Sequence, residues 1–275
     1  DSLVILMIVL AIHSATLPNA GEGFKFYLVP DFNNVKKQGF GTAVFAAMSH
    51  AFFTLSLGIG AMEIFGSYLT KEKRLGGEAI SVMVLDTFVA LMAGFIIIPA
   101  CFAFGVQPDS GPSLLFITLP NLFNQMAGGR IWGTLFFLFM TFACFSTIIA
   151  VFENIISFCI DMFGISRKKS VVINAVIILI ASLPCVFGFN IWSGFELFGQ
   201  NVLGMEDFLV SNILLPVGSL IYLLFCVTKF GWGFDNYLTE CNTGKGMKFA
   251  GFLKPYFQFV LPILVLIVLV QGFIK

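Results

Sequence analysis

The chain has 275 residues, of which 58% are hydrophobic and 11% are charged, and its mean hydropathy is +0.97. Soluble domains carry about 25% charged residues, so this composition excludes an ordinary soluble protein and favours one that spans a lipid bilayer. The 15 basic residues balance the 15 acidic residues, and this balance argues against nucleic acid as a partner.

The first stretch of the chain, residues 2–17, is apolar but slightly too short to cross a bilayer, so we expect it to be the end of a longer helix. The chain begins with Asp1 and shows no signal peptide, and we expect the N-terminal part of a longer protein to be missing from it. Residues 18–39 are polar and aromatic and contain a turn signal at Pro30 and Asp31, which predicts a loop.

The next segment, residues 40–69, is long enough to cross a bilayer but is expected to break in its middle. Residues 38–62 carry no charged side chain, yet Gly58 and Gly60 follow the hydroxyl residues Thr54 and Ser56. Each glycine costs a helix about 1 kcal/mol relative to alanine, which favours unwinding there. Backbone groups freed at membrane depth must be buried, line a cavity or bind something, and broken helices form the binding sites of secondary transporters. A kink or a close contact between helices is the alternative interpretation.

Five further apolar segments are each long enough to cross a bilayer. They cover residues 79–106, 131–163, 170–189, 208–228 and 255–274. Between the first two, residues 114–123 are apolar but too few to cross, which predicts a helix folded back onto the protein. The chain is therefore expected to be an all-α polytopic membrane protein with one partial and six complete transmembrane helices. Ten of the 15 basic residues fall in one set of connecting loops, which predicts that these loops face the cytoplasm.

Three acidic residues lie within the predicted spans: Glu63, Asp86 and Glu153. A carboxylate at the centre of a bilayer costs about 3 kcal/mol, so each of them is a candidate functional residue. Asp86 has no basic residue near it in the sequence and is interpreted as part of an ion site. For Glu153 we favour a structural partner on another helix, and the pattern assigns no role to Glu63.

Ala143, Ser146 and Thr147 have the i, i+3, i+4 spacing that places them on one face of a helix. Their oxygen atoms could bind an alkali cation. Serine and threonine hydroxyls in membrane helices, however, often bond to a carbonyl of their own preceding turn, and the pattern alone favours this second interpretation. Neither the six cysteines nor the two histidines have the spacing of a disulfide framework or of a metal centre.

Three motifs, in this order along the chain, resemble the neurotransmitter:sodium symporter family. LPNAGEG at residues 17–23 with FYLVPDF at residues 26–32 resembles the family's third outer loop. FFTLS at residues 52–56, followed by Gly58 and Gly60, resembles its broken sixth helix, and FITLP at residues 116–120 resembles its fourth outer loop. The resemblance implies a fragment of the LeuT-type fold, from the end of helix five through helix eleven, with a broken helix over residues 53–60.

The resemblance also implies how the fragment is organised. Residues 1–275 are then a single transmembrane domain fragment, in which residues 1–17 end helix five and residues 18–39 are an outer loop. Residues 40–228 would be the second inverted repeat and residues 249–275 the last helix. Helices one to four of the same protein, which complete both ion sites in this family, are then missing partners of the chain.

The candidate site residues follow from the same resemblance. Thr54 and Asp86 are similar to ligands of the family's first sodium site, and the Ala143 carbonyl, Ser146 and Thr147 are similar to ligands of the second. The positions that resemble substrate-lining residues are Phe53, Thr54, Ser56, Ile59, Thr147 and Val151. Phe53 also resembles the aromatic lid over the substrate, and Asp207 resembles the acid of the outer gate.

The chain departs from the family at some of these positions. Asp86 stands where the family often has Asn, and His50 where it often has Gln. Ile59 replaces a Phe, and Ala90 replaces a Glu that a chloride-independent member carries. Because Asp86 supplies a negative charge at the sodium position, we expect that chloride is not required.

The function favoured by these expectations is sodium-coupled symport of a hydrophobic amino acid across the cytoplasmic membrane of a bacterium. It would use two sodium sites, an amino-acid substrate and the lipid bilayer, and it is not an enzymatic activity. A proton-coupled amino-acid permease of the same fold is the alternative. An intramembrane hydrolase using Asp86 is a further alternative, although the sequence lacks a GxGD or GxSxG motif, and a scaffold or channel is the last.

Overall fold

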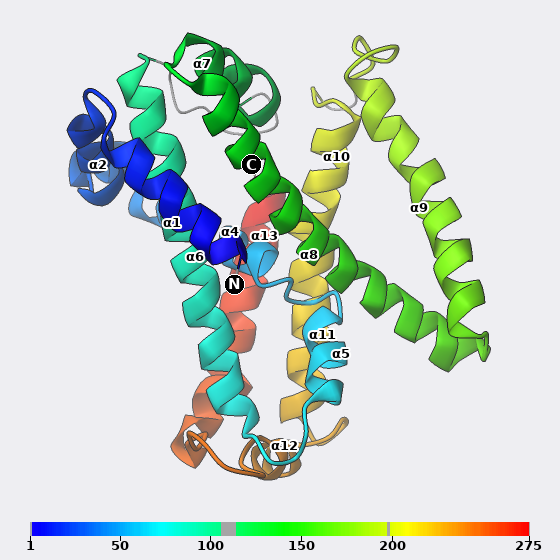
Figure 1. The fold of residues 1–275 in the computed structure, drawn as a ribbon. Helices are drawn as coiled ribbons and strands as arrows, with labels where there is room; N and C mark the ends of the chain where they lie inside the picture. Colours follow the sequence, from blue (N-terminus) through cyan, green and yellow to red (C-terminus); the bar gives the residue numbers. More distant parts are fainter. Residues whose placement is uncertain (1, 106–113, 197–198, 275) are drawn as a thin grey trace. The chain divides into compact units, whose positions relative to one another are not determined.

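The computed structural model describes residues 2–105, 114–196 and 199–274 (Figure 1). Within these ranges the chain is helical nearly throughout, and the β-bridge between Lys73 and Lys245 is isolated. The prediction of an all-α fold is therefore confirmed. The end of the predicted span at residue 106, and residues 107–113 of the connection that follows it, lie outside the described residues.

The described chain divides into two compact units. The first contains Asp1–Lys37 and Val84–Ile149, and the second contains Gln38–Met83 and Ala150–Lys275. The long helices α6 (Leu75–Ala103) and α8 (Gly129–Phe163) each contribute residues to both units. Each unit is described by itself below.

Among the described residues, five helical segments are long and apolar enough to cross a membrane, and each overlaps one of the five later spans predicted from the sequence. Three of them are α6, α8 and α9 (Arg167–Gly188). The fourth, Val202–Val227, joins α10 (Val202–Phe208), a π-helix (Leu209–Leu214) and α11 (Leu215–Val227). The fifth, Gly251–Phe273, includes a π-helix (Tyr256–Val260) and most of α13 (Leu261–Ile274).

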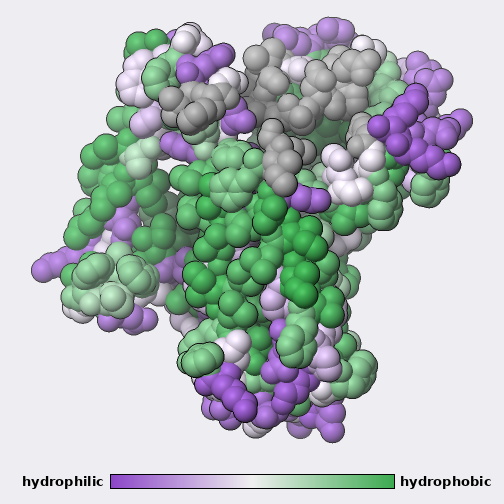
Figure 2. All heavy atoms as spheres, turned by 180° about the vertical axis from the view of Figure 1, so that it is seen from behind, coloured by the Kyte–Doolittle hydropathy of each residue, from purple (hydrophilic) through white to green (hydrophobic). Residues whose placement is uncertain are grey.

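Most side chains on these helices are apolar, and few of them are buried within the protein. In each of the five segments, no more than 22% of the most apolar stretch is buried within the protein. On the face shown in Figure 2, apolar residues cover the length of the helices and hydrophilic residues gather toward their ends. This distribution is expected where lipid surrounds the middle of a helix and water its ends.

Residues 18–39, predicted as a loop, contain two helices, α2 (Ala20–Leu28) and α3 (Phe32–Gln38). α2 makes an angle of 115° with α1, whose bounds are Ser2–Ala15. α2 packs on α6, because Gly23 lies directly against the backbone of Pro99 and the ring of Tyr27 covers Gly94. The sequence pattern missed α2 because short helices depend on packing against distant residues more than on their own propensity.

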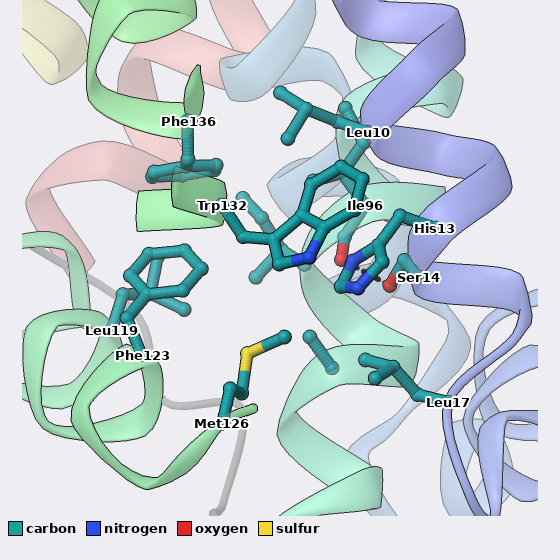
Figure 3. Close-up of a pocket in the computed structure, with 12 residues that line it drawn as sticks. Leu10, His13, Ser14, Leu17, Ile96, Leu119, Phe123, Met126, Trp132 and Phe136 are labelled. Atoms are coloured by element: carbon teal, nitrogen blue, oxygen red, sulfur yellow. Dashed lines mark hydrogen bonds between the residues drawn. The ribbon is translucent and has the colours of Figure 1, made fainter. Parts of the chain in front are cut away.

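The core of the first unit joins α1, α6, α7 (Leu119–Gln125) and α8. The predicted short helix of residues 114–123 is present as α7 and a preceding π-helix (Leu114–Thr118), and Leu119 and Leu122 are almost completely buried. Figure 3 shows His13 lying against Trp132, with ring centroids 3.5 Å apart. A cavity beside them measures about 20 Å³, which has room for a water molecule but not for an amino acid.

The core of the second unit packs α4 (Phe40–Thr54) against the C-terminal helices. Phe45 and Phe52 of α4 meet Leu215 of α11 and Val265 and Val268 of α13. At one end of this unit the connecting loops are joined by Arg74, which donates hydrogen bonds to the carbonyls of Asn242 and Gly246 at 3.0 and 2.6 Å. The chain between α4 and α5 (Ala61–Tyr68) packs against the same core through Leu57 and Ile59.

Candidate functional site

The predicted break of the helix is present as six residues, 55–60, between α4 and α5; it is the loop between these two labels in Figure 1. The break begins two residues later than the expected residue 53, since Phe53 and Thr54 remain helical. Ser56, Gly58 and Gly60 have φ angles of 51°, 87° and 82°, in the left-handed region. A helix cannot continue through such angles, so the backbone turns here.

The glycines of the break serve a second purpose, which is close packing on α11. A Cβ atom on Gly58 would lie 2.6 Å from the amide nitrogen of Ser219, and a Cβ on Gly218 would collide with the carbonyl of Gly58. The alternative interpretation of the glycines, a close contact between helices, is therefore also correct. Gly58 therefore allows the backbone to turn and, together with Gly218, allows the break to lie close to α11.

Several backbone groups of the break have no hydrogen-bond partner in the part of the chain that the structure describes. The amides of Ser56 and Leu57 bond back to the carbonyls of Phe53 and Phe52, both at 3.0 Å, which closes the end of α4. Among the described residues, no hydrogen bond forms from the amides of Gly58 and Gly60 or to the carbonyls of Leu55 and Leu57. Donors and acceptors that are free at the middle of a span are available to bind a polar ligand.

Asn154 of α8 holds the break in place. Its side-chain amide donates a hydrogen bond to the Ile59 carbonyl at 2.7 Å, and its Oδ1 atom would be 3.4 Å from a Cβ on Gly60. Val151, predicted to line the substrate, lies three residues earlier, on the same face of α8. The structure therefore brings the face of Val151 to the break. Sequence reasoning missed Asn154, whose only signal was a carboxamide in the middle of an apolar helix.

The other predicted substrate positions differ in exposure. Phe53 is 55% exposed, while Thr54, Ser56 and Ile59 are half-buried. Ser56 has a left-handed backbone conformation, which is costly for a residue with a Cβ atom. Such strain is held where the surrounding packing fixes the backbone.

The residues expected at the first sodium site lie in different units. Thr54 ends α4 in the second unit, and Asp86 lies half-buried within the apolar part of α6 in the first. Four residues further along α6, the carbonyl of Ala90 accepts a 3.5 Å hydrogen bond from the Tyr27 hydroxyl. His50, on α4, is exposed. Asp86 and His50 lie in helices within the predicted spans, whereas Thr54, expected in the broken part of its span, is the last residue of α4.

The residues expected at the second sodium site cluster on α8. The Ala143 carbonyl accepts hydrogen bonds from the Ser146 hydroxyl at 2.7 Å and from the Thr147 hydroxyl at 3.3 Å. The local interpretation of these hydroxyls is therefore correct. The same geometry gathers three oxygen atoms on one face of the helix, and oxygens are the ligands that hard cations prefer.

Two further acids of the second unit, Glu153 and Asp207, have separate settings. Glu153 pairs with Arg167 of α9, at 2.9 Å and 2.5 Å between its two oxygens and the guanidinium nitrogens, and accepts a 2.8 Å hydrogen bond from the Tyr68 hydroxyl. The prediction of a structural partner for Glu153 is thus confirmed. Asp207, the expected gate residue, is exposed on α10 and accepts a hydrogen bond from Ser211 at 3.0 Å.

Comparison with known proteins agrees with the family resemblance of the sequence motifs. A family model described as the sodium:neurotransmitter symporter family matches residues 2–275. The chain is 32% identical over 273 residues to an uncharacterized sodium-dependent transporter of Haemophilus influenzae and 33% identical over 268 residues to one of Bacillus subtilis. These matches cover 98% and 97% of the chain but 58% of each relative, so the chain spans little more than half the length of these proteins.

A solved structure agrees with these relatives. The crystal structure of MhsT in complex with L-phenylalanine matches this structure with a TM-score of 0.84 and 36% sequence identity. The match covers 98% of this chain and 60% of that chain. Together with the apolar helices, this likeness confirms the expected membrane fold.

Proposed function

Because the chain belongs to the sodium:neurotransmitter symporter family, we propose that the whole protein couples sodium to the transport of a hydrophobic amino acid across the cytoplasmic membrane of a bacterium. The family consists of sodium-dependent transporters and not of enzymes. The observation that carries the proposal is the break at residues 55–60, whose unpaired amides and carbonyls lie within an apolar span. Such groups need a polar partner, and a zwitterionic substrate supplies both an acceptor and a donor.

The side chains around the break support a hydrophobic substrate. Ile59 and Val151 are apolar and half-buried, and Phe53 is exposed at the end of α4. A charged substrate side chain among these groups would lose its hydration without gaining a partner. The L-phenylalanine bound to MhsT, which is 36% identical to this chain, gives further support.

The sodium ions would be held by oxygen atoms on three helices. Thr54 and Asp86 would contribute to the first site, where the Asp86 carboxylate would offset the charge of the ion. The Ala143 carbonyl, Ser146 and Thr147 would contribute to the second, where each hydroxyl would rotate its proton away from the ion. Coupling follows if the substrate carboxylate shares the first ion, so that neither binds well alone.

Uptake by the full-length protein in proteoliposomes tests this function. Uptake of labelled L-phenylalanine should require sodium, should be inhibited by leucine, tyrosine and tryptophan, and should not be inhibited by lysine or glutamate. The Asp86→Asn variant should lower the apparent sodium affinity by at least about tenfold, since it removes the charge that faces the ion. Glu78→Gln, which changes an acid at the start of the same helix, is the control and should behave as the wild type.

Two outcomes would contradict the proposal. Uptake in sodium-free buffer at low pH would show the proton-coupled permease instead, and inhibition by lysine or glutamate in preference to leucine would exclude the apolar site.

The same assay tests the expected chloride independence. Because Asp86 provides a fixed negative charge, replacing chloride with gluconate should leave uptake unchanged, and a loss of uptake would show that a mobile anion is needed.

A further inference from the structure

A pocket of about 340 Å³ lies within the second unit, against a different set of break residues from the proposed substrate site. Its walls come from α4, α5, α11, α12 (Phe234–Cys241) and the C-terminal helices. Phe52, Leu57 and Gly58 line it. Among its described lining residues there are none of the predicted substrate positions, so the two sites use different faces of the same break.

Three polar groups in this pocket lack partners. The Ser219 hydroxyl is buried and forms no hydrogen bond with any described residue. The carboxylate of Glu63 forms no hydrogen bond or ion pair with the part of the chain that the structure describes. The Tyr222 hydroxyl lies close to the break, 3.0 Å from where a Cβ on Gly60 would be, and likewise has no partner among these residues. Glu63 and Tyr222 are exposed, and Ser219 is the buried group of the three. A buried hydroxyl without a partner is costly, and so is a lone carboxylate at membrane depth, so the pocket calls for a ligand that supplies both partners.

The chemistry of the pocket selects a cation with an apolar body. Glu63 is the one charged residue among those described as lining it, so it would attract a positive group. The oxygens of Ser219 and Tyr222 could accept two further hydrogen bonds from an ammonium group. The rest of the wall is mostly apolar, with Phe52 and Phe257 among its members. Burial raises the pKa of Tyr237, which keeps this phenol neutral at the pocket wall.

We propose that this pocket is an accessory binding site for a small amphipathic amine, whose ammonium group pairs with Glu63 and Ser219 and whose apolar part packs against Phe52 and Phe257. The volume is within the range of small-molecule sites. Binding would join α5, through Glu63, to α11, through Ser219, across the contact between Gly58 and Gly218. If the proposed transport function holds, a bound amine would therefore hold the break in one shape and would inhibit uptake without competing with the substrate.

The test compares two probes of similar shape, 2-phenylethylamine and 2-phenylethanol, on the full-length protein in lipid nanodiscs. Binding is measured by titration calorimetry, with sodium and saturating L-phenylalanine present to fill the proposed substrate site, and again without either. The amine should bind saturably in both conditions, and the alcohol should bind at least about tenfold more weakly, because it lacks the charge that Glu63 recognises. Binding without sodium and substrate keeps this test separate from the test of transport.

Two substitutions and the chemical labelling of one cysteine test where the amine binds. Glu63→Gln should weaken amine binding at least about tenfold and leave alcohol binding unchanged, and Ser219→Ala should weaken amine binding about threefold. Glu78→Gln, outside the pocket, should change neither. Cys226 lines the pocket, so the bound amine should slow its alkylation by N-ethylmaleimide. The Cys226→Ser variant shows how much of the total labelling comes from the other cysteines.

The proposal is overturned if the amine and the alcohol bind equally, if Glu63→Gln retains amine binding, or if L-phenylalanine displaces the amine. It is also overturned if no saturable binding is found up to about 10 mM amine, which would show that another part of the full-length protein already satisfies Glu63. Should Glu63→Gln fail to fold, protection of Cys226 in the wild type decides: protection supports the site, and unchanged labelling excludes it.

Discussion

The short helix α5 is attached to α8 at both of its ends, and the two attachments differ in chemistry. At the end next to the break, a neutral amide of Asn154 donates one hydrogen bond to the Ile59 carbonyl at 2.7 Å. At the far end, the Tyr68 hydroxyl donates to Glu153 at 2.8 Å, and Glu153 is itself held by Arg167 through two further contacts. Hydrogen bonds with charged partners are roughly twice as strong as neutral ones.

The two ends of α5 are therefore held by attachments of different strength. Glu153 and Asn154 are neighbours on α8, yet they hold opposite ends of α5, one through a charged cluster and the other through a single bond. The end that carries the free backbone groups is thus the more weakly tied. A segment that must bind and release a ligand needs attachments that can break at small cost.

The largest effect is expected at the break itself, from Gly58→Ala. The added Cβ atom would be 2.6 Å from the Ser219 amide nitrogen, and alanine would have to adopt a φ of 87°. Backbone strain and overpacking together should lower the free energy of unfolding by about 3 kcal/mol. The thermal midpoint of the purified full-length protein, followed by size-exclusion chromatography after heating, measures the loss.

Gly66→Ala is the matched control for this prediction. Gly66 lies in α5, the helix that follows the break, and has an ordinary helical backbone. Apart from its own helix, no atom lies within 4 Å of the position its Cβ would take. Alanine there should leave the midpoint unchanged or raise it slightly. If the two alanine variants behaved alike, the close contact between the break and α11 would not be the reason for the glycine.

The break also shows what the sequence can and cannot predict. Gly58 and Gly60 identify it because their effect on a helix is local, and the bonds of Ser146 and Thr147 to their own turn are predictable for the same reason. The bond between Asn154 and Ile59 joins residues 95 apart, and no local pattern encodes such a partner.

For a charged residue inside a membrane, the sequence predicts that a partner is needed but not which residue it is. The need of Glu153 for a partner follows from its cost inside a membrane, but the choice of Arg167 depends on how α8 and α9 pack.

The helix α2 was missed because the contacts of Gly23 and Tyr27 with α6 are tertiary. The meeting of Thr54 with Asp86 at an ion site rests on family resemblance and stays a prediction.

The second largest effect is expected at the far end of α5, from Glu153→Gln. Glutamine can keep one hydrogen bond but loses the charge that pairs with Arg167, and the Glu153 side chain is only 16% exposed. The free energy of unfolding should fall by about 1 to 2 kcal/mol, and the difference from the wild type should shrink as salt is added. Heating curves at low and high salt provide the measurement.

Asp235→Asn is the control for the charged cluster. Asp235 pairs with Lys254 at 2.9 Å, but its side chain is 84% exposed, and ion pairs of this kind contribute little in water. Its midpoint should stay close to that of the wild type at both salt concentrations. A loss equal to that of Glu153→Gln would mean that the bidentate geometry of the cluster adds no stability.

A smaller effect on stability is expected for Asn154→Ala, which removes the neutral attachment. The loss should be about 1 kcal/mol, the usual net value of one such bond. Because this bond positions the break, the affinity for substrate should fall further than stability suggests, by about fivefold to tenfold in an equilibrium binding assay. Thr141→Val, which removes a local bond to Phe137 on the same helix, should change neither quantity, and equal losses in both variants would contradict the positioning role.

The smallest effect is expected for Ser157→Ala, although its hydroxyl is only 2.9 Å from that of Tyr68. Tyr68 has a single hydroxyl proton and donates it to the carboxylate of Glu153, so Ser157 must be the donor in its bond with Tyr68. Removing the serine leaves the Tyr68 bond to Glu153 intact and vacates one acceptor position on the phenol, which should cost less than about 0.5 kcal/mol. Tyr68→Phe removes both bonds and should cost about 1 kcal/mol, and the double variant should be no less stable than Tyr68→Phe alone. A large additional loss in the double variant would show that Ser157 supports Glu153 directly, and the charged end of α5 would then have one more anchor than Tyr68 and Arg167.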